Sequence, residues 1–338
     1  IVDEALLNTP EYGRTRQFIR EQFFIKAVFS FGRDAFWYQS RTTAKTSLLY
    51  LVRKPDPTVR QCEPIYFAHL TRLGFTRIGR PDTSDLPRAL ETYRRYEEAV
   101  RNATKNGRFD EAAAQNAVTP IVTTAGVHAG APLVQWQSGQ TRTPYARLDY
   151  AAEKARHLQA QLPANSRPLR DYVAPVERPD PDPATSYAFA NVERATGEVV
   201  PKKTLETQYR PDELRVLAAG DLVVSGIDFV HGSVGCAGKA VDQRVVSKEY
   251  YTLVLKPECE GSVDPRYLAL LLRTPEAREL AAGTVTGTSG RTRIENATAL
   301  LDLMLPPLPP FTEQQRLAQA VEDAYTARRE ALASIRTA

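Results

Sequence analysis

A proline-rich stretch near the middle of the chain constrains the fold more than any other feature of the sequence. Residues 174–185 read APVERPDPDPAT, with four prolines in twelve positions. Because proline donates no backbone hydrogen bond and disfavours helix in the residue before it, neither a helix nor a central strand is expected to cross this stretch. It predicts a linker and the main domain boundary, which divides the chain into two regions.

The region before this stretch alternates between helical and strand-like patterns. Residues 14–26 (RTRQFIREQFFIK) place apolar side chains at helical spacing, and residues 27–31, 47–54 and 64–70 are apolar runs of strand length. Residues 86–107 read as a charged amphipathic helix closed by Asn106-Gly107. A β-like patch at 132–137 and a helix at 147–162 follow. We therefore expect an α/β sheet in residues 1–85 and a helical connector in 86–173.

The region after the proline-rich stretch is β-rich and ends in helices. Residues 216–227 and 244–257 read as a turn with strands, and Pro275 interrupts a helix pair in 264–283. The apolar run ALLDLML (299–305) is expected to be a core strand. Thr312 with Gln315 has the spacing of a helix-capping box, and the face of the last helix is expected to comprise Leu317, Ala320, Val321, Ala324 and Ala331. The fold class is thus mixed α/β, with a domain at 174–311 and a packing or assembly helix at 312–338.

Composition and charge narrow the classes of function. The 338 residues are 42% hydrophobic and 25% charged, which is typical of a globular protein, and no apolar run is long enough to span a membrane. Three scattered cysteines have no zinc spacing and indicate a cytoplasmic protein with reduced thiols. The net charge is +4, but residues 201–295 carry thirteen basic and thirteen acidic side chains. Contact with nucleic acid there must come from local clusters.

Enzyme motifs are incomplete. Pro309-Pro310-Phe311 resembles part of the motif with which enzymes that methylate adenine hold the target base, but that motif begins with Asn or Asp, and Leu308 accepts no hydrogen bond. The two glycines of GVHAG (126–130) read as a loop rather than a cofactor-binding turn. We therefore assign no catalytic, cofactor-binding or metal-binding residue to this chain.

Two resemblances explain more of the sequence. FIREQFFIKAVFSF (18–31), AFWYQSRTTAKTSLLYLVRK (35–54) and GFTRIG (74–79) resemble the late part of the N6-adenine DNA methyltransferases of restriction–modification systems. RLDY (147–150), LAAGDLVVSGI (217–227), RVVSKEYYTLVLKP (244–257), DPRYLALLLRTPEA (264–277), GTSGRTRI (287–294) and residues 300–324 resemble the DNA specificity domain of type I restriction systems. Together these imply the tail of a Rossmann-like methyltransferase sheet, a helical connector and one α/β target-recognition domain that ends in a long helix.

The predicted DNA contacts follow from that resemblance and from residue chemistry. The loop GTSGRTR supplies small residues that allow close approach to a phosphate, and arginines that can form bidentate contacts with guanine or phosphate. The alternative is an ordinary solvated side chain for the arginines and for Lys202, Lys203 and Lys239, and a place at the end of a strand for Lys45. The candidates are Arg291, Arg293, Thr288, Ser289, Gly290, Lys239, Lys202, Lys203, Arg41 and Lys45.

The expected function is sequence-specific recognition of double-stranded DNA, as the C-terminal part of an N6-adenine methyltransferase in restriction–modification or phage defence. Such a complete enzyme would use S-adenosylmethionine, although no cofactor is expected in this portion. The alternatives are a separate specificity subunit and a non-catalytic assembly module. A restriction or second methyltransferase subunit is an expected partner of the last helix.

Overall fold

The computed structural model describes residues 1–105, 107–124, 131–137, 146–181, 187–202, 211–286, 293–294 and 296–337. The chain divides into two compact units, which are described separately. Unit 1 comprises Ile1–Lys154 with Thr286–Thr292, and unit 2 comprises Ala155–Val285 with Arg293–Ala338. The division falls inside one helix, α6 (Tyr150–Gln161). Among the described helices, none combines the length and apolar content that a membrane span requires.

Unit 1 is built on a five-stranded mixed sheet in the order β1-β3-β2-β4-β9. β2 pairs antiparallel with β3 and parallel with β4, so the strand that follows in sequence lies on one side and the next on the other. The strands of this sheet are β1 (Val2–Asp3), β2 (Phe23–Phe31), β3 (Thr46–Arg53), β4 (Ile65–Leu70) and β9 (Leu133–Gln135). Two hairpins accompany them: β5 (Leu73–Phe75) with β6 (Pro81–Ser84), and β7 (Thr104–Lys105) with β8 (Arg108–Phe109).

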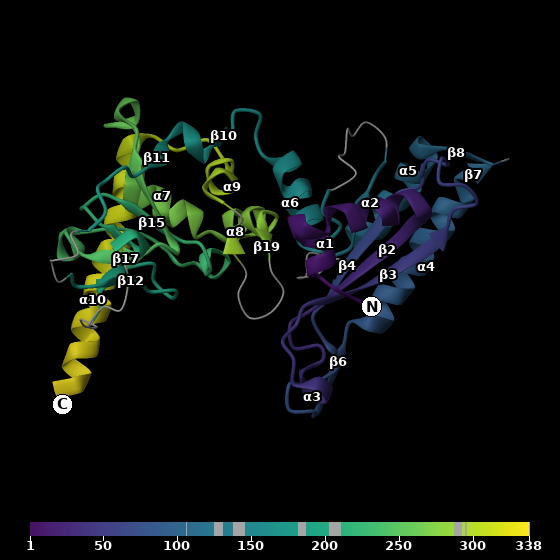
Figure 1. The fold of residues 1–338 in the computed structure, drawn as a ribbon, viewed down its shortest axis with the longest axis horizontal. Helices are drawn as coiled ribbons and strands as arrows, with labels where there is room; N and C mark the ends of the chain where they lie inside the picture. The colour runs from purple at the N-terminus through teal and green to yellow at the C-terminus, as the bar shows by residue number, and fades with distance from the viewer. Residues whose placement is uncertain are drawn as a thin grey trace. The chain divides into compact units, whose positions relative to one another are not determined.

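Helices cover both faces of this sheet, which makes unit 1 a layered α/β structure. On one face, Phe29 and Tyr66 pack against Tyr93 and Tyr96 of α4 (Leu86–Asn102) and against Val118 of α5 (Glu111–Thr124). The other face packs against Leu7 of α1 (Ala5–Asn8), Ile19 of α2 (Gly13–Gln22) and the start of α6. Two short helices, η1 (Pro10–Tyr12) and α3 (Trp37–Ser40), complete the unit. Figure 1 shows β2, β3 and β4 side by side, with α4 running along them.

Unit 2 is assembled from short strands around one large apolar cluster. Its main sheet is antiparallel, in the order β11-β18-β15-β16, and three strand pairs surround it: β10–β21, β12–β13 and β14–β17. The strands are β10 (Arg167–Pro168), β11 (Val173–Pro175), β12 (Ala190–Val192), β13 (Val199–Pro201), β14 (Leu214–Val216), β15 (Leu222–Ser225), β16 (Val234–Cys236), β17 (Val245–Ser247), β18 (Tyr250–Leu255), β19 (Val285–Thr286), β20 (Arg293–Ile294) and β21 (Met304–Leu305). The helices are α7 (Pro265–Leu272), α8 (Pro275–Ala282), α9 (Ala297–Leu301) and α10 (Phe311–Thr337). The short 3-10 turns are η2 (Leu169–Asp171), η3 (Pro211–Glu213), η4 (Phe229–His231), η5 (Lys239–Val241) and η6 (Pro257–Cys259).

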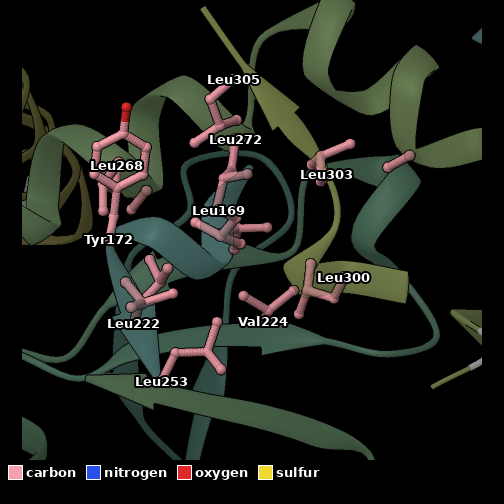
Figure 2. Packing of buried hydrophobic residues seen from close by; sticks show 14 of the residues in the cluster. Leu169, Tyr172, Leu222, Val224, Leu253, Leu268, Leu272, Leu300, Leu303 and Leu305 are labelled. Atoms are coloured by element: carbon pink, nitrogen blue, oxygen red, sulfur yellow. The ribbon is translucent and has the colours of Figure 1, made fainter. Parts of the chain in front are cut away.

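The core of unit 2 joins segments that are far apart in the sequence. Figure 2 shows Leu169, Leu222 and Leu253 meeting Leu268 and Leu272 of α7, with Leu300, Leu303 and Leu305 closing the cluster. Leu268, Leu272 and Leu305 are fully buried. The residues named here alone come from six different elements, so the apolar side chains of each segment are buried by contacts with distant segments.

The mixed α/β class is confirmed, together with the strands at 222–225 and 250–255 and the helix break at Pro275. The predicted domain boundaries at 85/86 and 173/174 do not coincide with the two compact units, because α4 packs on the sheet of unit 1 and Val173–Pro175 pairs with β18. The proline-rich stretch therefore begins inside a sheet: Pro175 ends an edge strand, where a missing donor is tolerated.

Four local predictions were wrong. The helix expected at 14–26 ends at Gln22, and β2 begins at Phe23. Gly107 lies in the β7–β8 hairpin rather than at a helix end, since α4 already stops at Asn102. ALLDLML is not a strand: Asn296 caps α9 by accepting from the Ala299 amide, and only Met304–Leu305 is extended. The capping box is not formed, because α10 starts at Phe311.

The contact that fixes the start of α10 comes instead from Gln314. Its Nε2 donates to the carbonyl oxygens of Pro309 (2.8 Å) and Ser262 (3.1 Å), and its Oε1 accepts from the Asp264 amide at 3.0 Å. The side chain is 1% exposed. The inward stripe of α10 is therefore Gln314 and Ala318, with Leu317, Val321 and Tyr325 half-buried, whereas Ala320, Ala324 and Ala331 of the predicted face are exposed.

Candidate nucleic-acid interface

The predicted DNA contacts divide into two groups in the structure. Five of them lie outside the residues that the structure describes: Arg291, Thr288, Ser289, Gly290 and Lys203. GVHAG (126–130) lies outside them as well. The other five are described: Arg41, Lys45, Lys202, Lys239 and Arg293. Their surroundings differ strongly, and these surroundings decide what each side chain can bind.

Lys45 faces the interior of unit 1. Its Nζ lies 2.9 Å from Oε2 of Glu4, which is 1% exposed, and the backbone N–H of Glu4 donates to the Lys45 carbonyl at 3.0 Å. Burial raises the pKa of Glu4, and the positive charge of Lys45 partly offsets this. Since Lys45 neutralises a buried carboxylate, its prediction as a DNA contact requires it to serve two charges at once. That prediction stays untested.

Lys45 belongs to a polar layer of unit 1 that also contains His69, Arg147 and Asp149. Nε and Nη2 of Arg147 donate to the two oxygens of Asp149, each at 2.8 Å, and Asp149 is 1% exposed. Burial alone would raise the pKa of Asp149, but Arg147 outweighs it and the net pKa is lowered. Burial, with repulsion from Lys45, lowers the pKa of His69 to about 4. This layer is a structural network held inside the unit.

Arg41 is the opposite case, an exposed side chain at the end of α3. Its backbone is left-handed (φ 53°), and its amide donates to the Trp37 carbonyl at 2.8 Å. Among the described residues no carboxylate lies within ion-pair distance of it. The guanidinium is therefore available to an anionic ligand, as its prediction as a DNA contact requires.

Arg293 is exposed but paired. Its Nη2 lies 2.9 Å from Oε2 of Glu249, in the turn between β17 and β18. Gly226 joins the two segments: its N–H donates to the Glu249 carbonyl and its carbonyl accepts from the Ile294 amide, both at 2.8 Å. A Cβ at Gly226 would lie 2.9 Å from the Glu249 carbonyl oxygen, so close packing explains why a glycine stands there. To contact DNA, Arg293 would exchange Glu249 for a base edge or phosphate.

Lys202, Lys239 and Arg244 form a second basic place in unit 2, which we call the cation cluster. Nη1 of Arg244 donates to the carbonyl of Phe189 at 3.4 Å, and the backbone N–H of Lys202 donates to the same oxygen at 2.8 Å. Nε of Arg244 donates to the Ala240 carbonyl at 3.3 Å, beside Lys239. η5, which contains Lys239, packs against β13, which immediately precedes Lys202. Two segments, Lys202 after β13 and residues 239–244 between β16 and β17, thus bring three basic residues together.

The cation cluster differs from many other basic side chains of unit 2 because no carboxylate among the described residues forms an ion pair with it. Carboxylates hold many of the rest: the pairs are Arg178–Asp221, Arg194–Asp228, Arg215–Asp180, Lys248–Glu213, Arg266–Asp264, Arg293–Glu249 and Arg329–Glu198. Within the part of the chain that the structure describes, no carboxylate lies within ion-pair distance of the cluster. The nearby Asp242 instead accepts from the Ala219 amide at 3.1 Å. The cluster is thus a local concentration of basic side chains on a unit that carries 21 basic and 24 acidic side chains in all.

Lys239 also borders a groove between β16, α7 and α10 with a volume of about 410 Å³. The arginines of this groove are engaged: Arg266 with Asp264 and Glu322, Arg329 with Glu198, and Arg273 with the carbonyls of Gly232 and Arg194. The Arg266–Glu322 and Arg329–Glu198 pairs fix α10 to the rest of unit 2, so the groove is a packing seam. Lys239 is the side chain at its rim that is left for an external anion.

Sequence reasoning found Lys202 and Lys239 but missed Arg244. No spacing pattern in the sequence marks Arg244, because it contacts Phe189, 55 positions before it, and Ala240 in the preceding turn. The side chain is half-buried, and its guanidinium is positioned by two carbonyl oxygens. A half-buried arginine that donates to backbone carbonyls, with no carboxylate of the described residues within ion-pair distance, is the feature that would mark it in a structure.

Comparisons with known proteins give partial matches only. No protein-family model matches the chain, and no curated protein sequence does. Among solved structures, the HsdS subunit from Thermoanaerobacter tengcongensis matches with 25% identity over 50% of this chain and 44% of that one, at a TM-score of 0.37. The type I restriction–modification S subunit from M. genitalium matches with 18% identity over 52% of this chain and 42% of that one, at a TM-score of 0.33. This chain therefore spans less than half of either subunit, and the assignment below uses its own residues.

Proposed function

We propose that the chain recognises double-stranded DNA by sequence and that unit 2 carries the recognition, as a target-recognition domain in a restriction–modification or phage-defence system. The observation that carries this proposal is the cation cluster, in which Lys202 meets Lys239 and Arg244 of another segment, and no carboxylate of the described residues lies within ion-pair distance of the three. Protein cations that neutralise phosphates supply most of the non-specific affinity for DNA through release of counterions. Such contacts set the register of a protein on the duplex.

In this proposal the cation cluster positions the duplex, and residues 287–294 read bases. Arg293 stands at the described end of that segment and is held by Glu249. An exposed ion pair of this kind is worth less than about 1 kcal/mol, so exchanging Glu249 for DNA costs little. A bidentate arginine–guanine contact would supply about 1–3 kcal/mol of discrimination. Arg291, Thr288, Ser289, Gly290 and Lys203 remain proposed contacts on the sequence evidence.

Unit 1 is proposed to be the end of an N6-adenine methyltransferase fold. Support comes from the motifs quoted above and from the position of its TSLLYLVR strand, β3, which runs antiparallel beside β2 while β4 runs parallel on the other side. The complete enzyme would take its methyl group from S-adenosylmethionine and act in the cytoplasm. We assign neither a catalytic nor a cofactor-binding role to the described residues, because Leu308 before Pro309 cannot accept from an adenine amino group.

Two alternatives have specific support. A separate specificity subunit would carry the same reader and depend on another chain for catalysis. An assembly module would use α10, whose last turns carry the exposed side chains of Leu332 (45%) and Ile335 (73%). Figure 1 shows these turns extending beyond the strands of unit 2. A restriction or methyltransferase subunit is the proposed partner of this helix.

The test is binding of the full chain to randomised duplexes, followed by sequencing of the retained pool and by affinity measurements at several salt concentrations. We expect enrichment of a short, adenine-containing motif. The triple variant Lys202→Gln, Lys239→Gln, Arg244→Gln should lower the salt slope by about 0.9 for each phosphate contact that is lost. Lys248→Gln is the matched control, because Lys248 is exposed in the same unit but paired with Glu213.

Each outcome assigns the function differently. An unchanged salt slope in the triple variant would remove the cation cluster from the interface. Retention of DNA without enrichment of any motif would contradict recognition by sequence. A chain that retains no DNA at any salt concentration would leave the assembly module as the better assignment.

A further inference from the structure

The β5–β6 hairpin of unit 1 ends in a tight, well-braced tip at residues 76–80. The Thr76 amide donates to the Arg80 carbonyl at 2.8 Å, and the Gly79 amide donates to the Thr76 carbonyl at 2.9 Å. The Arg80 amide also donates to Oγ1 of Thr76 at 3.2 Å. Gly79 has φ +82°, which a residue with a Cβ adopts only with strain. The tip therefore holds one defined shape.

The tip is also braced from below by α3. The Arg77 guanidinium lies over the Trp37 ring, with Cζ 4.0 Å from the ring centroid, and its Nε is 3.7 Å from Oδ1 of Asp34. The rings of Tyr38 and Phe75 are 6.5 Å apart. A Cβ on Gly79 would collide with the Tyr38 ring, so the glycine allows the tip to sit directly on this side chain. These contacts resist bending when the tip is loaded.

The outer surface of this braced tip carries apolar side chains that the fold does not use. Ile78 is 67% exposed at the turn, between Arg77 and Arg80, and the side chains of Tyr38 and Phe75 are 50% and 46% exposed. Leaving an isoleucine in water forgoes about 1.5–3 kcal/mol relative to burying it. The turn itself is satisfied by Thr76, Gly79 and Arg80, so it gives no structural reason for an isoleucine at position 78.

The charge around the tip is mostly positive. Residues 33–41 and 72–84 contain five arginines, Arg33, Arg41, Arg72, Arg77 and Arg80, and two acids, Asp34 and Asp82. Arg72 is held by Asp85, and Arg77 by Asp34. Among the described residues no carboxylate lies within ion-pair distance of Arg41 or Arg80. The tip thus presents a single branched apolar side chain between arginines, on a rigid support.

We propose that this tip is a second DNA-contact element, in which Arg77 and Arg80 contact phosphates on either side of a base step and Ile78 enters that step as a wedge. The inference rests on the proposed function, in that the ligand is duplex DNA. Proteins that unstack a base step do so with one apolar side chain flanked by basic residues. A protein partner fits less well, because a stable interface has an apolar core with few charges and about 800 Å² per side.

Rigidity is what the wedge requires. Unstacking one base step costs a few kcal/mol, and a flexible loop would fold away rather than force the bases apart. The stacked Arg77–Trp37 pair and the close approach of Gly79 to Tyr38 hold in place the turn that carries the exposed Ile78. Tyr38 and Phe75 lie beside it with exposed faces, on which an unstacked base would find a partner.

The test uses the full chain with a short duplex that carries the fluorescent base 2-aminopurine, placed at each position in turn. Unstacking raises the fluorescence of this base. The wild type should raise it at one step, and Ile78→Ser should abolish the rise while changing the affinity by less than about tenfold. Ile78→Leu should retain it. Arg77→Gln with Arg80→Gln should lower the salt slope by about 0.9 per lost contact.

Two exposed residues of unit 1 serve as matched controls. Val59→Ser and Arg60→Gln remove an apolar and a basic side chain outside the hairpin, and both should behave as wild type. If neither the Ile78 variant nor the arginine variant differs from these controls, the wedge is overturned. The wedge is also overturned if the wild type raises the 2-aminopurine fluorescence at no position of the duplex.

The cation-cluster variant, measured in parallel, separates this inference from the proposed function. If the tip variants match the controls while the cation-cluster variant loses affinity, the wedge fails and the reader in unit 2 stands. If the tip variants lose unstacking or affinity while the cation-cluster variant binds as wild type, the wedge stands and the reader fails. A loss in both confirms two contact elements. If neither the wild type nor any variant binds the duplex, both the wedge and the reader in unit 2 are overturned.

Discussion

Lys45 of unit 1 and Lys239 of unit 2 were both expected to contact DNA, yet their surroundings are opposite. Lys45 reaches a carboxylate that is 1% exposed, inside a network with buried Asp149 and His69. Lys239 is exposed beside Lys202 and Arg244, and no acid among the described residues pairs with it. One region uses its cations to keep buried acids ionised, and the other leaves its cations for a ligand.

The difference teaches that the partner, rather than the lysine, determines the role. Glu4 precedes Lys45 by 41 positions and meets it because β1 pairs with β3. Arg244 meets Lys202 through the carbonyl of Phe189. Neither meeting is encoded by local spacing. The comparison also predicts that mutations in the first region should change stability, and mutations in the second should change binding.

The largest effect on stability is expected from Arg147→Ala, which leaves Asp149 buried without its bidentate partner. Breaking a buried ion pair on one side costs about 3–5 kcal/mol. Urea unfolding followed by tryptophan fluorescence measures this, because Trp37 and Trp136 both lie in unit 1. The exposed Arg60→Ala should stay within about 0.5 kcal/mol of wild type. A loss of stability below about 1 kcal/mol for Arg147→Ala would mean that the polar layer does not depend on this ion pair.

The next effect depends on pH and reports His69. Its pKa is about 4 in the folded chain, below the ordinary value, so the unfolded chain takes up the proton first as pH falls. Stability is therefore complete above about pH 6.5 and is lost between there and pH 4, by about 3 kcal/mol. His69→Gln should remove this part of the pH dependence. Parallel stability curves for His69→Gln and wild type would contradict the assignment.

The smallest effects sharpen the comparison directly, through the same substitution at two lysines. Lys45→Gln should cost about 1–3 kcal/mol, because Glu4 loses its cation in a buried site. Protonation of Glu4, whose pKa is already raised, limits the loss at low pH. Lys239→Gln should change stability by less than about 0.5 kcal/mol while weakening DNA binding. Equal losses of stability at both positions would erase the distinction between the two regions.

The sequence predicted the fold where a segment carries its own pattern. The apolar runs at 27–31, 47–54 and 64–70 became β2, β3 and β4, since a buried strand needs several apolar residues in succession. Pro275 split α7 from α8 because it starts a helix well and continues one badly. The leucines of ALLDLML were correctly placed in the core, but as helix and turn, because a short apolar run fits either state.

The rest depended on contacts between distant segments. Gln315 has the spacing of a capping box, but Gln314 fixes the helix start, because its partners Ser262 and Asp264 lie in the distant loop between η6 and α7. A glycine stands at position 226 because a Cβ there would lie 2.9 Å from the Glu249 carbonyl oxygen, a contact that no local sequence pattern shows. In the candidate site, Lys202 and Lys239 were predicted because one lies beside an expected turn and the other in a glycine-rich stretch, whereas Arg244 needed the fold.

The length of the 27-residue α10 determines where its last side chains lie. Gln314 fixes its first turn, and contacts of Tyr325 with Thr196 and Arg329 with Glu198 fix it again farther along. From Gln314 to Ile335 the axis measures about 32 Å at 1.5 Å per residue. The number of residues in the helix sets both its length and the orientation of its last side chains. Deleting one residue between Arg329 and Leu332 would shorten the helix by about 1.5 Å and rotate Leu332 and Ile335 by about 100° around the axis. The number of residues in this part of α10 therefore sets both the distance and the direction at which a partner of these two side chains would be held.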